Sequence, residues 1–445
     1  MPEAMIPVIA TQDVERAVRL SYAQAMVGSI FAASTGGMFL IGYALQLGAQ
    51  NVHIGLMSTI PMLCVVVQLL SSLLVERGVS RRKLTLTFAL LNVFGWGLII
   101  LIPYLAAGKS LGVKMGALIG IITLVTLFGQ VSGNARGSWV GDLIPERFRG
   151  TFFGRLTMYG GIIGTVFALI EGRFLDLVKS SGIGAFSWLF AAGMLFGLAN
   201  ALLFAPQVDV PLQRKSEKGQ FTGYLRATFA NGPLMVVMLY ALLWSLQGIA
   251  GPFFATYMLR DLGMPFLGIG IVNSAVTLTM LFSSPFWGRV VDRYGCRPVL
   301  ISCTAGIAPL SLIWLVATNA RLVYWLIIPV NLLCGFLVAG VSVALNTLVY
   351  KITPSAGRSV QFAVYSIIVV LCAAPMPTIG GNLADFAQAH WPAIGLRATF
   401  FAAIPFITLA SFAARFIKEP ASRHTGELMR NLPNHLRKPA TLRQE

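Results

Sequence analysis

The sequence has little charge for its length. Asp, Glu, Lys and Arg together make up 11% of the 445 residues, whereas hydrophobic residues make up 56%. A water-soluble globular domain carries about twice that share of charged residues. The mean hydropathy of +0.76 agrees with this imbalance. The composition therefore excludes a soluble globular protein and indicates that lipid is the main solvent of the chain.

Cysteine and histidine are scarce, with five and four residues respectively. They form no CxxC pair and no Cys/His cluster, which excludes a disulfide framework and a zinc site. The triplet Gly108-Lys109-Ser110 looks like the end of a P-loop, but Pro103 stands where the first glycine is required. No catalytic triad signature is present either. We therefore expect neither an enzyme nor a bound cofactor or metal.

Acidic residues are half as numerous as basic ones, which gives a formal net charge of +17. In a soluble protein this balance would suggest a nucleic-acid partner. Here the basic residues stand in short connections between apolar runs, without a basic stripe or interleaved aromatic residues. No nucleic-acid partner is expected.

Long apolar runs dominate the chain. Each has roughly 20 residues or more, which is the length of a membrane-spanning helix and far more than a barrel strand needs. Charged and turn residues separate twelve such runs: 22–47, 52–75, 84–107, 113–141, 152–176, 185–206, 233–259, 266–291, 298–318, 322–350, 359–386 and 394–417. The sequence predicts an all-α integral membrane protein with twelve transmembrane helices.

The polar segments divide the chain and orient it. Residues 207–232 form the longest internal polar stretch and are predicted to link two six-helix bundles, 22–206 and 233–417, between an N-terminal segment 1–21 and a basic tail 418–445. If the N-terminus is cytoplasmic, 25 of the 33 Lys and Arg residues fall on the cytoplasmic side and 7 on the other. Basic residues are retained in the cytoplasm, so both termini are predicted there.

The two halves of the sequence resemble each other. The segment Tyr43-Ala-Leu-Gln-Leu-Gly48 matches Tyr257-Met-Leu-Arg-Asp-Leu-Gly263. Three further residues recur at a constant offset of 209, namely Pro145, Arg149 and Asp176 as Pro354, Arg358 and Asp385. Internal repeats of this kind are typical of secondary transporters.

The loop after the eighth span carries a more specific pattern. Gly288-Arg-Val-Val-Asp292-Arg293-Tyr-Gly295-Cys-Arg297 resembles the G-x-x-x-D-R-x-G-R signature of the major facilitator superfamily. Asp142-Leu-Ile-Pro145-Glu-Arg-Phe-Arg149-Gly150 is similar to the family's connection between its fourth and fifth helices. The first-half copy of the signature departs from it, with Ser72 and Glu76 in place of glycine and aspartate. The resemblance implies the major facilitator fold, two pseudo-symmetric six-helix bundles about a cavity that opens alternately to either side.

Charges at the span ends suggest a cytoplasmic gate. A carboxylate such as Asp292 can face the positive N-terminus of a neighbouring helix, and Arg293 and Arg297 can bridge to nearby carboxylates. Alternatively, these charges only stop the helix and enforce topology. The predicted gate consists of Gly288, Asp292, Arg293, Arg297, Glu76, Arg77, Arg81, Asp142, Arg149 and Arg358.

The resemblance places the first, fourth, seventh and tenth helices around the cavity. Their polar residues are the candidate substrate ligands: Ser34, Gln130, Asn134, Arg136, Trp244, Gln247 and Asn346. Arg136 is the only basic residue well inside a span, where it should face a cavity or snorkel to the interface. Facing the cavity, it would favour an anionic or polar substrate. Gly133, Gly137 and Gly141 around it are expected to let another helix approach closely.

Titratable groups inside the spans are few. Proton coupling usually needs one within the pathway, and only Glu171 qualifies. Arg173 nearby offers a structural ion pair as the alternative. The sequence therefore predicts a secondary transporter or facilitator for a small solute, monomeric in the lipid bilayer, with a coupling proton or ion as an open possibility. A transporter-like receptor or scaffold without net transport, or a polytopic membrane enzyme, is the alternative.

Overall fold

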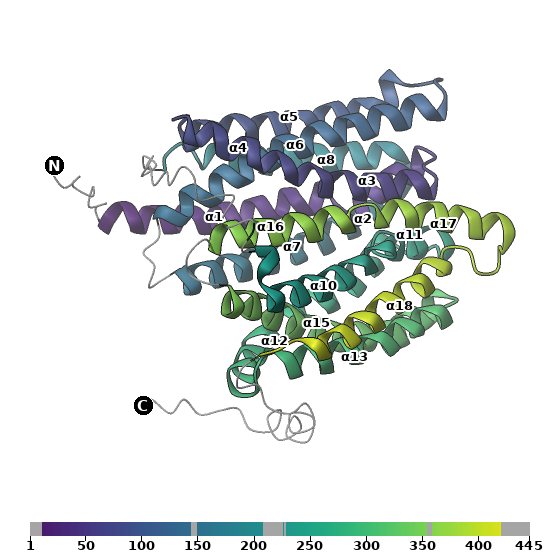
Figure 1. Cartoon of the computed structure of the whole chain (residues 1–445). Coiled ribbons are helices and arrows are strands. Elements are labelled where there is room, and N and C mark those ends of the chain that lie inside the picture. Colours follow the sequence, from purple (N-terminus) through teal and green to yellow (C-terminus); the bar gives the residue numbers. More distant parts are fainter. Residues whose placement is uncertain (1–10, 144–148, 208–225, 227, 354–357, 420–445) are drawn as a thin grey trace. The chain divides into compact units, whose positions relative to one another are not determined.

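The computed structural model describes residues 11–143, 149–207, 226, 228–353 and 358–419. Within these ranges all regular secondary structure is helical (Figure 1). Twelve helical segments are long and apolar enough to cross a membrane, which confirms the predicted number. In the bilayer a helix satisfies its own backbone hydrogen bonds, and this explains the absence of other elements among the described residues.

The chain divides into two compact units. Unit 1 contains residues 1–216 together with 265–270, and unit 2 contains 217–264 and 271–445. The division therefore passes through the helix Phe266–Tyr294 (α12), whose first residues belong to unit 1 and whose remainder belongs to unit 2. The predicted linker lies mostly outside the described residues.

Unit 1 contains six spans, of which two are interrupted. The neighbours α5 and α6 pack along each other, and α1 packs against both α7 and α8 (Figure 1). The helices are α1 (Thr11–Thr35), α2 (Gly37–Gln46), α3 (Asn51–Leu63), η1 (Cys64–Val66), α4 (Val67–Glu76), α5 (Arg81–Leu105), α6 (Leu111–Leu143), α7 (Arg149–Leu177), η3 (Lys179–Ser181) and α8 (Ile183–Leu202).

Unit 2 repeats this plan. Here α13 packs against α15 and α18, and α10 packs against α18. Its helices are α10 (Gly232–Leu246), η4 (Gln247–Ile249), α11 (Phe253–Thr256), the π-helical turn η5 (Tyr257–Asp261), α12, α13 (Cys296–Val316), α14 (Ala320–Leu322), the π-helical turn η6 (Val323–Ile327), α15 (Ile328–Ile352), α16 (Arg358–Ala373), α17 (Met376–His390), α18 (Arg397–Ala413) and η7 (Ala414–Phe416).

The sequence repeat has a structural counterpart in each unit. The Tyr43 hydroxyl donates a hydrogen bond of 2.6 Å to the carbonyl of Ile99, and the Tyr257 hydroxyl donates one of 2.7 Å to the carbonyl of Ala317. Both repeats then end at a glycine with positive φ, 95° at Gly48 and 58° at Gly263. Only glycine adopts this conformation without strain. The matched tyrosines thus join the first and third spans of each half.

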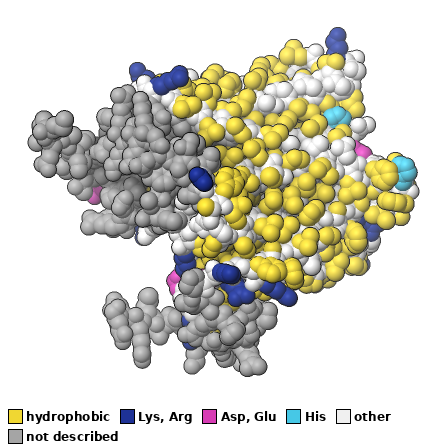
Figure 2. Space-filling view, viewed as in Figure 1, with side chains coloured by type: hydrophobic (Ala, Val, Ile, Leu, Met, Phe, Trp, Pro, Cys, Tyr) yellow, Lys and Arg dark blue, Asp and Glu magenta, His cyan; other side chains and the backbone are white. Residues whose placement is uncertain are grey.

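Hydrophobic side chains occupy both the interior and the surface. Unit 2 has a core of buried residues from α10, α12, α13, α15 and α18, in which Trp287 donates its indole N–H to the carbonyl of Phe336 at 2.6 Å. Many other large apolar side chains, such as Trp325 and Phe282, remain exposed. Figure 2 shows hydrophobic side chains over much of the described surface that faces the viewer, with Lys and Arg mostly at its margins. This distribution suits lipid around the helices.

Candidate functional site

The first span is broken in its middle. Helix α1 ends at Thr35, Gly36 forms a bend, and α2 begins at Gly37, whose φ is 51°. The break interrupts the backbone hydrogen bonds where lipid could not replace them, so such breaks occur only where protein or a water-filled cavity surrounds them. In the sequence, the adjacent glycines Gly36 and Gly37 are the signal for this break. We predicted a continuous span over 22–47, without the break.

Ser34 and Glu171 meet beside this break. The Ser34 hydroxyl oxygen lies 2.9 Å from the carbonyl oxygen of Ile30 and 2.5 Å from Oε1 of Glu171 on α7. A hydroxyl carries one hydrogen and can donate it to only one of these acceptors. Both contacts are satisfied when Glu171 is protonated and donates to Ser34, which in turn donates to Ile30. The arrangement therefore fits a neutral carboxylic acid.

Glu171 has no cationic partner among the described residues. Its side chain is buried, with 8% of its surface exposed, and Oε2 has no hydrogen-bond partner in the described part of the chain. Arg173, the alternative partner considered from the sequence, is exposed and forms no ion pair with it. Burying a carboxylate without a partner costs far more than burying the neutral acid. This position is suited to a group that binds and releases a proton.

A small residue leaves room for this pair. A Cβ atom placed on Gly193 of α8 would lie 2.6 Å from the Cβ of Ser34, closer than real side chains approach. On α7, Gly160 and Gly164 similarly lie against Ala25 and Ser29 of α1. These glycines allow three helices to enclose the Ser34–Glu171 pair.

Gln130 and Asn134 lie within a second polar cluster of unit 1. The Gln68 amide donates to Oε1 of Gln130 at 2.7 Å, and the Asn134 amide donates to the carbonyl of Gln68 at 3.1 Å and to the Ser72 hydroxyl at 3.0 Å. Gln68 and Ser72 belong to α4, after the short turn η1 that follows Pro61 in the second span. Neither residue is among the ligands predicted from the sequence, although the Gln68 amide inside an apolar run was the available signal.

Arg136 does not share the face of Asn134. Two residues along an α-helix correspond to a rotation of about 200°. The Arg136 guanidinium lies 5.6 Å from the centroid of the Phe204 ring, whose cluster includes Trp139. This cation–π contact gives the charge a partner inside unit 1. We expected another helix to approach Gly133 and Gly137 closely, and this prediction is wrong: a Cβ atom added to either glycine would meet no described atom within 4 Å. The surroundings of Gly141 lie outside the described residues.

The seventh span is broken as the first one is. Helix α10 ends at Leu246, Gln247 begins the 3-10 turn η4, and a turn at Gly251 precedes α11. Trp244 packs partly against the core of unit 2, and Gln247 is half-buried at the break. Asn346 on α15 is exposed. The tight contact of Gly380 on α17 with the carbonyl of Ile249 supports the broken segment.

The two breaks occupy corresponding positions. They follow Thr35 in the first half and Leu246 in the second, an offset close to that of the sequence repeat. Interrupted helices at matching positions of two repeats typically mark the binding site of a transporter. Ser34 and Gln247, both selected from the sequence, stand at these breaks.

Asp176 holds the beginning of α12 within unit 1. Its two carboxylate oxygens accept hydrogen bonds from the backbone N–H groups of Phe266 at 2.8 Å and Leu267 at 2.9 Å. A carboxylate at a helix N-terminus pairs with orphan donors and with the positive end of the helix dipole. A Cβ on Gly172, one turn earlier on α7, would lie 3.0 Å from the same backbone. The sequence repeat singled out Asp176, but it did not indicate that the carboxylate binds the beginning of α12.

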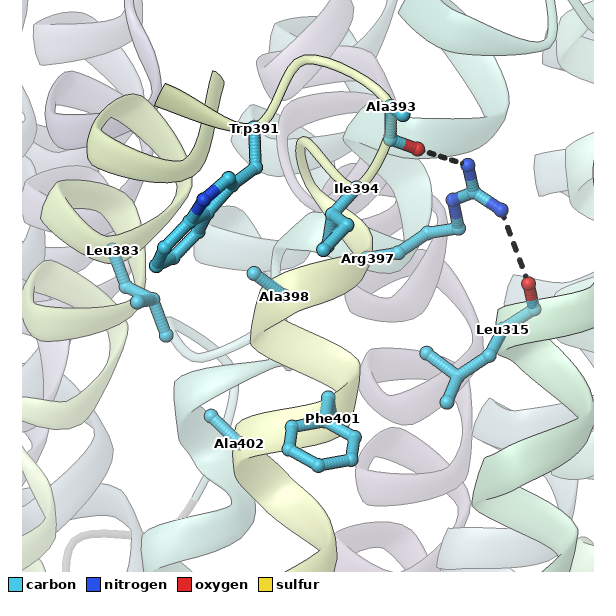
Figure 3. A pocket seen from close by; sticks show the side chains of 9 residues that line it. All are labelled: Leu315, Leu383, Trp391, Ala393, Ile394, Arg397, Ala398, Phe401 and Ala402. Atoms are coloured by element: carbon cyan, nitrogen blue, oxygen red, sulfur yellow. Dashed lines mark hydrogen bonds between the residues drawn. The ribbon is translucent and has the colours of Figure 1, made fainter. Parts of the chain in front are cut away.

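A groove in unit 2 is a poor substrate site. It has a volume of about 590 Å³ beside the turn between α17 and α18, and is lined by Leu383, Trp391, Ile394 and Phe401 among others (Figure 3). The Arg397 guanidinium points to its side, where it donates to the carbonyls of Leu315 and Ala393. The groove offers no convergent polar groups for a polar solute.

Comparison with known proteins gives a family match for the second half of the chain. The sequence model described as Major Facilitator Superfamily matches residues 234–443. A protein of Aspergillus fumigatus, the major facilitator superfamily multidrug transporter mfsB, is 26% identical over 138 residues, which are 31% of this chain and 22% of that protein. The match thus spans about a fifth of that relative's length.

Solved structures match over nearly the whole chain. The nucleoside transporter NupG has a TM-score of 0.68 at 12% identity and covers 92% of this chain and 99% of its own. A bacterial homologue of the human lysosomal transporter Spinster has a TM-score of 0.66 at 15% identity, over 92% and 99%. Residues 234–443, the second half of the chain, thus match the major facilitator superfamily by sequence, and the whole chain has the fold of its transporters. It is accordingly a multi-pass membrane protein with the twelve-helix fold of that superfamily.

The residues of the loop signature make other contacts than we expected. The expected bridge from Arg297 to a carboxylate is not found among the described residues, because its guanidinium donates to the carbonyl of Arg415 at 2.8 Å. Arg293 lies over the Tyr294 ring at 5.6 Å. Asp292 is exposed, and Gly288 leaves open space around its Cα.

The carboxylate that contacts this loop is Glu419, which is not among the residues predicted from the sequence. Its Oε2 accepts from the backbone N–H groups of Cys296 at 2.7 Å and Arg297 at 2.9 Å, at the start of α13. Its Oε1 pairs with Lys351 at 3.1 Å, and its side chain is only 4% exposed. Because Glu419 lies more than 120 residues from the first residues of α13 in the sequence, spacing alone could not reveal the contact.

The first-half counterpart also has a buried arginine. Arg81 is 2% exposed and donates to the carbonyl of Ser138 at 3.1 Å and to its hydroxyl at 3.0 Å, whereas Arg77 is exposed. The side chains of the other predicted gate residues lie outside the description: Glu76, Asp142, Arg149 and Arg358. The gate itself stays a prediction.

Replacing Glu419 with glutamine is expected to destabilise the protein. The glutamine side chain can still accept from the backbone of α13, but it loses the ion pair with Lys351 and the negative charge at a helix N-terminus. Because the carboxylate is buried while the Lys351 side chain is 46% exposed, this loss costs about 1–3 kcal/mol. Thermal unfolding in detergent, followed by thiol-reactive fluorescence, should show a lower Tm. The control is Glu15→Gln, which removes an exposed ion pair with Arg19 and should leave Tm unchanged; equal shifts would contradict this account of Glu419.

Proposed function

We propose that this protein is a secondary transporter that carries a small polar solute across the membrane by alternating access. The observation that carries the proposal is the pair of matching breaks in the first and seventh spans, with half-buried or buried polar groups at each. The family match of the second half and the transporters among the structural relatives support it. The match to a transporter family also counts against an enzyme.

The solute is proposed to be recognised by hydrogen bonds. The predicted ligands Gln130, Asn134, Gln247 and Asn346 all carry amides, which donate and accept. Arg136 already has an aromatic partner within unit 1. A polar substrate is therefore favoured over an anionic one.

Glu171 is proposed to carry a coupling proton. Its burial, its contact with Ser34 and the lack of a partner for Oε2 among the described residues support this role over the ion pair with Arg173. Because Ser34 stands at the break of the first span, protonation of Glu171 would alter a hydrogen bond beside the proposed binding site.

Both termini are proposed to be cytoplasmic, on the basis of the distribution of Lys and Arg. Protease treatment of sealed inside-out and right-side-out vesicles, with an epitope tag at either end, tests the orientation. Cleavage of both tags only in inside-out vesicles is the expected result. Removal of a tag in right-side-out vesicles would refute it.

Transport is tested on the purified protein. A thermal-shift screen of nucleosides, sugars, amino acids and short peptides selects solutes, and their uptake is then measured in proteoliposomes with and without a pH gradient. We expect saturable uptake of at least one of them, increased by the gradient. A solute that stabilises the protein but never enters the vesicles would favour the alternative of a receptor with a transporter fold.

A further inference from the structure

A basic pocket lies at one end of unit 2, apart from the break in the seventh span. It has a volume of about 830 Å³ and is formed where α10 and α13 begin and where α15 and η7 end. The residues that line it are Pro233, Arg297, Lys351, Ile352, Arg415, Phe416, Ile417, Lys418 and Glu419.

Positive charge exceeds negative charge in this pocket. Four of the lining residues are basic, and Glu419 is the only acidic one. Its carboxylate is already shared between Lys351 and the backbone of α13. Arg415 and Lys418 are exposed and pair with no acidic side chain in the described part of the chain. In a chain with so little charge, such an uncompensated group indicates an anionic partner.

The position of the pocket specifies that partner. Four spans end here, so the pocket lies at the depth of the lipid head groups. Beside it, Phe412 and Phe416 are 53% and 59% exposed, and Arg415 lies over the Phe412 ring at 5.8 Å. Figure 2 shows Lys and Arg side chains beside the apolar surface near the end of α18. The basic groups suit a phosphate, and the exposed aromatic rings beside them suit the acyl chains attached to it.

We infer that this pocket binds the phosphate head group of an anionic phospholipid, whose acyl chains lie along Phe412 and Phe416. Basic pockets between transmembrane helices bind acidic head groups through the same chemistry. Arg415 and Lys418 supply the long-range attraction, and the buried Arg297 Nε, which has no described hydrogen-bond partner, provides a further donor near the pocket.

The test uses the full-length protein in a neutral detergent. Native mass spectrometry measures the affinity for phosphatidylglycerol and for phosphatidylcholine, and thermal shift in inorganic phosphate measures the response to the free anion. The double variant Arg415→Gln/Lys418→Gln removes two charges but retains the carbonyl that accepts from Arg297. The matched control Lys109→Gln/Arg321→Gln removes two exposed charges from other connections.

The expected result is preferential binding of phosphatidylglycerol, about 10- to 30-fold weaker in the double variant and unchanged in the control. Since both side chains are exposed, the Tm without lipid should stay the same, which shows that the variant is folded. Equal affinity for the two lipids, or an equal loss in the control, would overturn the inference. Stabilisation by inorganic phosphate alone, without preference for the lipid, would refute a lipid site in favour of a soluble anion.

Discussion

Replacing Glu171 with glutamine is expected to abolish accumulation of the solute against its gradient, while exchange of solute across the membrane persists. Glutamine has nearly the same volume and can still donate to Ser34, so the fold and the break in the first span should be retained. It cannot release a proton, however. Measured in proteoliposomes with an imposed pH gradient, accumulation should fall to the level set by simple equilibration with the outside solution.

Two variants serve as controls for this result. Ser34→Ala removes the hydroxyl and should reduce accumulation only in part, because the carboxyl group remains. Glu15→Gln removes an exposed carboxylate of α1, which is ion-paired with Arg19 at 3.6 Å, and should behave like the wild type. Wild-type accumulation by the Glu171→Gln variant would show that the carboxyl group is structural and that any coupling resides elsewhere.

The Asp176→Asn substitution is expected to loosen the beginning of α12. Asparagine presents one oxygen in place of two and carries no charge, so the backbone N–H groups of Phe266 and Leu267 lose a charge-assisted partner. The loss of about 1–2 kcal/mol corresponds to a roughly 5- to 30-fold rise in amide exchange. Hydrogen–deuterium exchange of peptides covering residues 264–270 measures it directly.

The control for this prediction lies just before α12. Asp261 forms an exposed ion pair with Arg260 at 3.2 Å, and Asp261→Asn should leave the exchange of residues 266 and 267 unchanged. Unaltered protection in Asp176→Asn would contradict the role of this carboxylate. Because α12 continues from unit 1 into unit 2, slower transport by the variant would further indicate that this attachment matters during the cycle.

Hydrophobicity was sufficient to predict the twelve membrane spans, and the resemblance of the loop signatures supplied the fold. The twelve spans follow from the length of apolar runs, since the bilayer leaves the backbone few options. The repeat was also informative in detail, because Tyr43 and Tyr257 were matched by sequence and donate equivalent hydrogen bonds in the two halves. Both features depend on local composition or on a regular repeat, so they can be read from a single sequence.

The candidate site was predicted only in part. Ser34, Gln130, Asn134 and Gln247 were selected from the sequence because polar residues are rare in apolar spans, and they remain candidates. Their partners depend on which faces of the helices meet, which a single sequence does not reveal. The predictions that proved wrong failed because a single sequence does not show which helix faces meet.

Arg136 and the glycines around it illustrate this limit. The sequence showed a buried charge and a row of small residues, and both suggested close contact or a cavity. The structure places the Arg136 charge on the ring of Phe204, which belongs to a distant part of the chain, and leaves Gly133 and Gly137 without a close neighbour among the described residues. Glu419 was missed for the same reason, since its role arises only where the end of the last span meets the start of α13.

The most direct test of the account follows protons during transport. Proteoliposomes containing a pH-sensitive dye are supplied with the solute selected in the uptake screen, with no pH gradient imposed. We predict that the solute changes the internal pH in wild-type vesicles, and that neither protein-free vesicles nor those with Glu171→Gln show the change. Solute uptake with constant internal pH would contradict coupling at Glu171, and the absence of uptake for every stabilising solute would contradict transport itself.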